Sequence, residues 1–154
     1  ELWGQPAEAL AYVPVQLSGR FVPEAYFLLD NQVRSGQFGH EVLGVLQLDG
    51  DGGVVIVNRG WIAGDAARQS LPSVPAVDGG VVITGHVYVA PGAPFLLAEQ
   101  QFEVGWPKRI QAVEMDKLVK AIAPLHRDKV FPYPVRIDAG EPGALAVDWQ
   151  VVNM

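Results

Sequence analysis

Three histidines and one polar motif are the parts of this chain whose residue types could do chemistry. The histidines are His40, His86 and His126. Their separation does not fit the H-x-H or H-x-x-x-H spacing of metal sites, and the G-x-S-x-G pentapeptide of a hydrolase nucleophile is absent from the sequence. Cysteine is absent as well, which removes thiol nucleophiles and zinc ribbons. We therefore expect no enzymatic activity, no catalytic residue and no metal site in this chain.

An acidic, glycine-rich segment, Asp-Gly-Asp-Gly-Gly at residues 49–53, resembles an ion-binding loop only in part. An EF-hand would need a bidentate glutamate where the sequence has Gly60. The segment also precedes a predicted strand rather than a helix, so no helix N-terminus faces a phosphate. Its composition is typical of a hairpin loop.

The most unusual motif is Asn58-Arg59-Gly60-Trp61, which follows the apolar run of residues 54–57. Consecutive apolar residues predict a strand that is covered on both faces. A buried Arg59 would be costly unless carboxylate or carbonyl groups accept its hydrogen bonds. One hypothesis is therefore structural, with a polar clamp at the strand end and Trp61 in the core. The other is a partner-binding anchor, because Arg and Trp dominate binding hot spots.

Alternating apolar residues predict the strands that must position these side chains. Period-two patterns and short apolar runs predict strands at residues 13–21, 26–33, 42–48, 54–62, 81–89, 109–113, 131–137 and 145–151. Pro14 indicates a strand start or a sheet edge, and Pro132 and Pro134 place their strand at an edge.

Turns, loops and one helix complete the predicted elements. Glycine and polar residues predict turns at 35–39 and 49–53. Long loops are predicted at 64–80, with a short helical turn at 65–69, and at 90–105, with the apolar cluster Phe95-Leu96-Leu97. Asp116 is expected to cap a helix over residues 117–123, which Pro124 stops.

Together these elements predict a mainly β fold. Seven or eight strands with hairpin-like spacing, and one short helix in the C-terminal half, favour an antiparallel barrel or sandwich. A chain of 154 residues suits a single domain, 1–154. The 17 glycines and 12 prolines also argue against a helical bundle.

Charge and hydrophobicity exclude several kinds of partner. The chain has 11 basic and 17 acidic residues, a net charge of −6, and its longest basic run is Lys108-Arg109. These values disfavour a nucleic-acid surface and an anionic membrane surface. Apolar residues make up 49% and charged residues 18%, as expected for a folded core. No apolar run approaches the roughly 18 residues that span a bilayer.

Ordered motifs along most of the chain resemble one known family. Residues 13–21 look like a V-x-G-x-F strand, residues 36–43 like a G-x-x-G-x-x-V turn, and residues 54–61 like a V-x-V-N-R-G-W strand. Segments at 106–111, 116–118, 131–133 and 148–154 are similar to those of proteobacterial members. The set resembles the surfeit locus protein 1 family, also called Shy-one, of cytochrome oxidase assembly factors. Leu43-Gly44-Val45 departs from it, because the family usually has L-T-P there.

The resemblance implies a function and a place in the cell. It implies a domain between two transmembrane helices that lie outside this sequence, in the bacterial inner membrane, with the domain in the periplasm. The implied function is a non-enzymatic chaperone in cytochrome c oxidase assembly, for haem a insertion into subunit I. Its partners would be subunit I or other haem-handling assembly proteins.

The implied cofactor leaves one alternative open. Haem a is implied for the full-length protein, with a histidine near the second helix as the proposed ligand, so no haem ligand is assigned to this chain. The alternative is a barrel that holds haem or lipid inside this domain, as small antiparallel barrels can. A hydrolase or isomerase ranks last.

Overall fold

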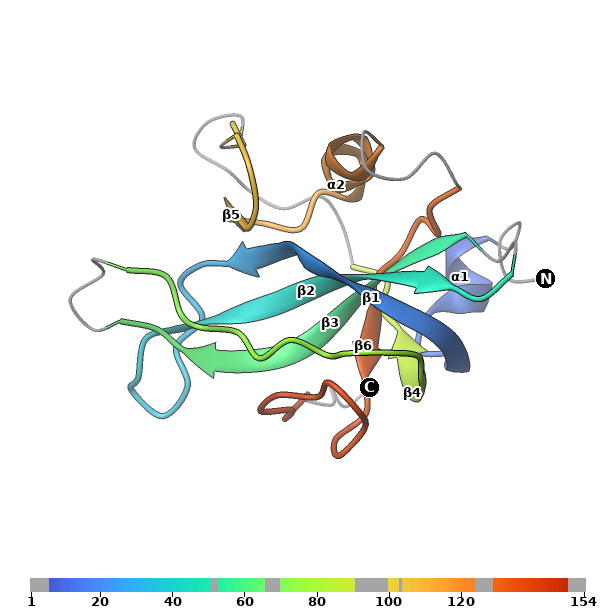
Figure 1. Ribbon diagram of the computed structural model, residues 1–154, viewed down its shortest axis with the longest axis horizontal. Helices are drawn as coiled ribbons and strands as arrows, with labels where there is room; N and C mark the ends of the chain where they lie inside the picture. Colours follow the sequence, from blue (N-terminus) through green and yellow to red (C-terminus); the bar gives the residue numbers. More distant parts are fainter. Residues whose placement is uncertain are drawn as a thin grey trace.

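A ring of five strands forms the centre of the computed structural model, which describes residues 6–50, 53–65, 70–90, 100–102, 104–123 and 129–149. The elements are α1 (Ala7–Leu10), β1 (Pro14–Leu29), β2 (Gly39–Leu48), β3 (Val54–Ala63), β4 (Val81–Val87), β5 (Lys108–Ile110), α2 (Met115–Ile122) and β6 (Val135–Ile137) (Figure 1).

The order of the sheet shows how the ring closes. The strands follow the order β2-β3-β6-β4-β1, and pairing of β1 with β2 completes the barrel. All the pairs in the ring are antiparallel except β3 with β6, and β5 joins β1 in parallel outside the ring. The predicted mainly β, barrel-like class is confirmed, but the sheet is mixed rather than wholly antiparallel, and the described residues form six strands rather than seven or eight.

The predicted strands at 13–21 and 26–33 both fall on one long strand, β1, which ends at Leu29, so residues 30–33 form no strand. Its register with β2 jumps, since Phe21 faces Leu46 while Tyr26 faces Gly44. Glu24, between them, has a φ of 68°. A bulge of this kind bends a strand. The first part of β1 can therefore pair with β4 in the ring, and the last part with β5 outside it.

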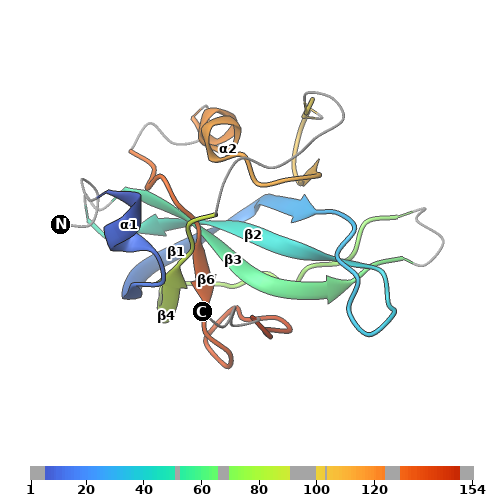
Figure 2. The same ribbon diagram turned by 180° about the vertical axis from the view of Figure 1, so that it is seen from behind.

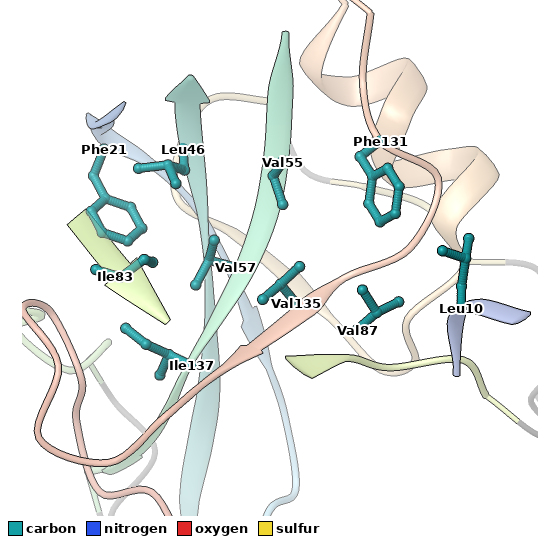
Figure 3. Packing of buried hydrophobic residues seen from close by; sticks show 10 residues of the cluster. All are labelled: Leu10, Phe21, Leu46, Val55, Val57, Ile83, Val87, Phe131, Val135 and Ile137. Carbon is teal, nitrogen blue, oxygen red and sulfur yellow. The ribbon is translucent and has the colours of Figure 1, made fainter. Parts of the chain in front are cut away.

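The inside of the barrel is filled with apolar side chains from all five of its strands (Figure 3). Leu10 of α1 and Phe131 belong to the same buried cluster. The strand residues of this inner cluster are Phe21, Leu46, Val55, Val57, Ile83, Val87, Val135 and Ile137. Small barrels are ordinarily filled in this way, and the packing does not favour a ligand inside the ring.

A second apolar cluster covers the outer wall of the barrel. It joins Leu43, Val45, Val54 and Ile56 of the β2–β3 wall to residues of β1, β5 and α2. Both views place α2 and β5 over the same side of the barrel (Figures 1 and 2). This explains the apolar run at 54–57: Val55 and Val57 belong to the inner cluster, whereas Val54 and Ile56 belong to the outer one. The prediction of a strand covered on both faces is confirmed.

The C-terminal strand predictions need correction. Of residues 131–137, only Val135–Ile137 form a strand, and β6 lies between β3 and β4 rather than at an edge. Pro132 and Pro134 precede it, so their missing N–H groups interrupt no pairing. Residues 145–149 form no strand, and Ala146 alone bridges to Trp61. The rest of that prediction, Val151 included, lies outside the described residues.

The two helices also differ from expectation. Helix α2 begins at Met115, and Glu114 takes the N-cap position without a side-chain cap hydrogen bond, so the predicted cap at Asp116 is wrong. The four-residue α1 was not predicted. No helix in the described part of the chain has the length and apolar character needed to cross a bilayer.

The predicted turns are confirmed where the structure describes them. Arg34 and Gln37 exchange backbone hydrogen bonds of 3.0 and 2.9 Å, with positive φ at Ser35 and Gly36. Strands β2 and β3 form a hairpin, although residues 51–52 of its loop lie outside the described residues. In the loop 64–80, the described residues 64–65 and 70–80 are irregular. The predicted helical turn at 65–69, Phe95-Leu96-Leu97, Pro124 and His126 fall largely or wholly on residues that are not described.

Candidate functional site

The motif Asn58-Arg59-Gly60-Trp61 lies at a bulge in β3. Val42 of β2 faces Gly60 while Leu43 faces Asn58, so Arg59 is the extra residue. Gly60 has a φ of 109°, which glycine tolerates and other residues rarely adopt. A Cβ atom there would also lie 2.7 Å from the carbonyl oxygen of Ala146. The bulge therefore requires glycine at position 60.

Arg59 is a buried cation with only 5% of its surface exposed. Its Nε donates to the carbonyl oxygen of Gly143 and its Nη2 to that of Pro75, both at 2.8 Å. Its Cζ lies 5.5 Å from the centre of the Phe21 ring. Burial lowers the pKa of Arg59, and the nearby Tyr26 opposes this shift. Carbonyl groups thus supply the partners that a buried arginine requires, and they tie two loops to β3.

Asn58 joins a buried polar network on the outer side of the same bulge. Its Nδ2 donates to Glu41 Oε1 at 2.9 Å, and its Oδ1 accepts the backbone N–H of Gly60 at 3.0 Å. The other oxygen of Glu41 accepts from Arg34 Nη2 at 2.7 Å. The Glu41 carboxylate therefore has both an opposite charge and an amide donor, as a buried carboxylate needs.

Trp61 lies over Gly39 and is half-buried. Its Nε1 donates to the carbonyl oxygen of Gln32 at 2.6 Å, and its backbone exchanges hydrogen bonds with Ala146. Trp61 belongs to neither apolar cluster, so the expectation that it fills the core is wrong. Of the four motif residues, it is the one that is not buried.

Two cavities adjoin the outer side of the motif. The first, of about 610 Å³, is lined by Asn58 and mainly by apolar residues of the barrel wall, the segment before α2 and the segment before β6. The second, of about 1070 Å³, is lined by Trp61, Trp149 and residues of the 33–37 turn. Both share the residues Glu41, Tyr88, Val89 and Arg136. The four shared residues make the two cavities neighbours.

The described histidines do not fit haem ligands in these cavities. His40 is buried, with its Nδ1 2.9 Å from Asp30 Oδ1 in a contact that lacks hydrogen-bond geometry, and its ring packs against Phe38. His86 is exposed and pairs with Asp138 at 3.0 Å, as expected for a solvated histidine. Neither histidine lines either cavity. No group of His, Asp and Glu in the described residues could hold a metal ion.

Arg136 was missed from the sequence. It lies beside His86 of β4 and Asn58 of β3 in the pairing of β6, and its guanidinium contacts the rings of Tyr88 and Trp149. The sequence signal was only the position of Arg136 between the inward-facing Val135 and Ile137. Its two ring partners lie in irregular segments outside the helices and strands, which local sequence patterns cannot place beside β6.

Comparison with known proteins gives one result. The model of the SURF1 family matches residues 1–154. No significant match was found among curated proteins or among solved structures.

Proposed function

The chain belongs to the SURF1 family, and from this premise we propose that it is an assembly factor for cytochrome c oxidase. The observation that carries the proposal is the family match over residues 1–154. This is the surfeit locus protein 1 family that the ordered motifs indicated. Its association with oxidase assembly is the basis for the function.

In this proposal Asn58-Arg59-Gly60-Trp61 acts mainly by holding the loops near the partner-binding surface in position. Arg59 and Gly60 are buried and line neither cavity, and the buried Asn58 lines only the first cavity, so the motif offers a partner little surface apart from Trp61. Arg59 instead fixes the positions of Pro75 and Gly143, and hence of the loops that carry them. Trp61 lies beside the second cavity and is the residue of the motif most able to contact a partner.

The finer parts of the proposal concern haem and location. We propose a non-enzymatic chaperone that acts in haem a insertion into subunit I, from the periplasmic side of the bacterial inner membrane. Haem is the cargo here, and subunit I or another haem-handling assembly protein is the partner. Because His40 is enclosed and His86 lies outside both cavities, the proposal routes no haem ligation through either residue.

The test is complementation in the organism that encodes the protein. Deleting the gene should lower oxidase activity and the haem a absorbance of membranes, and the full-length wild-type gene should restore both. Trp61→Phe keeps a ring over Gly39 but removes the N–H donor and part of the contact surface. If Trp61 contacts a partner, this variant should lower oxidase activity at an unchanged protein level.

A second variant distinguishes the structural role of Arg59 from contact of Trp61 with a partner. Arg59→Met should lower the protein level and oxidase activity together, because the arginine acts on the fold. Arg20→Met, at an exposed position of β1, is the matched control and should restore activity fully. A deletion strain with normal oxidase would argue against the function itself.

A further inference from the structure

The Arg136 guanidinium contacts two aromatic rings, and no hydrogen-bond acceptor for it is found among the described residues. Its Cζ lies 3.6 Å from the centre of the Tyr88 ring and 4.9 Å from that of Trp149. Neither contact uses an N–H donor. Within the described ranges, no carboxylate or carbonyl oxygen accepts a hydrogen bond from this guanidinium. Its donors are therefore available to an anion.

The surrounding contacts hold these two rings in place. Trp149 Nε1 donates to the carbonyl oxygen of Ile137 at 2.7 Å. Tyr88 packs edge-on against Tyr12, with 6.4 Å between ring centres, and its backbone N–H donates to the carbonyl oxygen of Pro134. Tyr12 itself has a φ of 64°, a conformation that is costly for a tyrosine. Such preorganised aromatic groups are typical of a binding site.

Arg136 lies where the two cavities meet. It lines both, and the first cavity has a volume within the range of small-molecule sites. Its apolar lining includes Leu29, Leu43, Val89, Val113 and Met115. A molecule with an apolar body in the first cavity would therefore bring a polar end to Arg136.

The charges around the cavities favour a single negative charge on that end. Glu41 is already paired with Arg34, so Arg136 is the lining cation without an acidic partner in the described residues. Asp148 also lines the second cavity and would repel a doubly charged group. A guanidinium fork matches the planar shape of a carboxylate.

We propose that Arg136 binds the carboxylate of an amphiphilic monocarboxylic acid, whose apolar body occupies the first cavity. This site lies outside the barrel ring and does not rest on a role in oxidase assembly. A binding experiment with the purified protein can therefore fail while the assembly function stands, or the reverse.

Titration of the wild-type protein with laurate, methyl laurate and laurylamine tests the recognition of charge. The titrations are followed by calorimetry and by the total fluorescence of the four tryptophans, of which Trp61 and Trp149 line the second cavity, below the concentration at which micelles form. Laurate should bind saturably at one site, about tenfold or more tighter than the ester, because hydrogen bonds to charged groups are strong. Equal affinity for all three compounds, or no saturable binding of laurate, would overturn the proposal.

Variants then locate the site. Arg136→Gln should weaken laurate binding about tenfold or more and leave methyl laurate binding unchanged. Arg20→Gln, on the exposed face of β1, should bind like the wild type. Val113→Trp, which fills the first cavity, should abolish binding of both compounds and keeps the test decisive if Arg136→Gln does not fold. Wild-type laurate affinity in either site variant, or displacement of laurate by inorganic phosphate at similar concentration, would contradict the assignment.

Discussion

Arg59 is held in the protein by backbone carbonyls rather than by an acidic residue. A guanidinium with 5% exposure requires acceptors for its donors, and Pro75 and Gly143 provide them at 2.8 Å. The sequence identified this requirement but not the partners, because they lie 16 and 84 residues away along the chain. The residue that looked most like a binding anchor is thus a point of attachment for two loops.

Replacing Arg59 by methionine should lower stability. The change leaves the carbonyls of Gly143 and Pro75 without their donor, at roughly 1–3 kcal/mol for each buried group, partly offset because no charge is buried. We expect a loss of about 2 kcal/mol or more in the free energy of unfolding, measured in urea. The exposed Arg20→Met should stay within about 0.5 kcal/mol of the wild type. Equal stability of the two variants would contradict a stabilising role for the Arg59 hydrogen bonds to Gly143 and Pro75.

Gly60 is expected to be more sensitive to substitution than another glycine with positive φ. Gly79 has a φ of 76° and open space where a Cβ atom would lie, whereas Gly60 combines positive φ with a close carbonyl. Gly79→Ala should cost about 1 kcal/mol, from backbone strain alone. Gly60→Ala should cost about 2–4 kcal/mol, because overpacking adds to the strain. Urea unfolding of both variants measures the difference, and similar losses would mean that the bulge can relax.

Tyr26 should make the protein lose stability in alkali. Burial raises the pKa of Tyr26 above its ordinary value of about 10, while Arg59 lowers it and Glu24 raises it. The unfolded chain therefore releases the phenol proton first, and the free energy of unfolding falls as the pH rises above about 10. Tyr26→Phe should remove this part of the loss. The stability difference between the two proteins, followed from about pH 8 to about pH 11, should change with pH, and a constant difference would contradict the shift.

At the scale of elements, local patterns predicted most strands but not their neighbours. The alternation at 81–89 indicated β4, because a strand with one buried face alternates apolar and polar residues. The apolar run at 54–57 indicated β3, because a strand buried on both faces is apolar throughout. The two predicted strands join into β1 through the bulge near Glu24, and the pattern of apolar and polar residues does not indicate that bulge. The central place of β6 follows from barrel closure, whereas Pro132 and Pro134, which precede it, suggested an edge.

Helix α2 should contribute to stability through its buried face. Leu118 and Ile122 are fully buried in the outer cluster, while Lys120 is exposed on the same helix. Leu118→Ala should cost about 2–5 kcal/mol, as large-to-small core changes do. Lys120→Ala should change stability by no more than about 0.5 kcal/mol. Thermal and urea unfolding of the two variants compare them directly, and a tolerated Leu118→Ala would mean that α2 is not packed on the wall.

At the scale of the whole molecule, the residues that stabilise the barrel are separate from the cavities that could bind a ligand or partner. The inner cluster fills the barrel, so the space for a ligand or partner lies outside the ring, around Arg136 and Trp61. The sequence pointed to Asn58-Arg59-Gly60-Trp61 and missed Arg136, because its two ring partners, Tyr88 and Trp149, come from two segments that are separate in sequence from β6. The family could be identified from ordered motifs, whereas the positions of the cavities required the tertiary structure.

The central claim is that this chain acts in cytochrome c oxidase assembly. Its most direct test is the oxidase activity of membranes from cells that lack the gene, compared with the same cells carrying the full-length gene again. We expect reduced oxidase activity in the deletion strain and full recovery with the restored gene, at unchanged levels of other respiratory complexes. Unchanged oxidase activity in the deletion strain would contradict the claim.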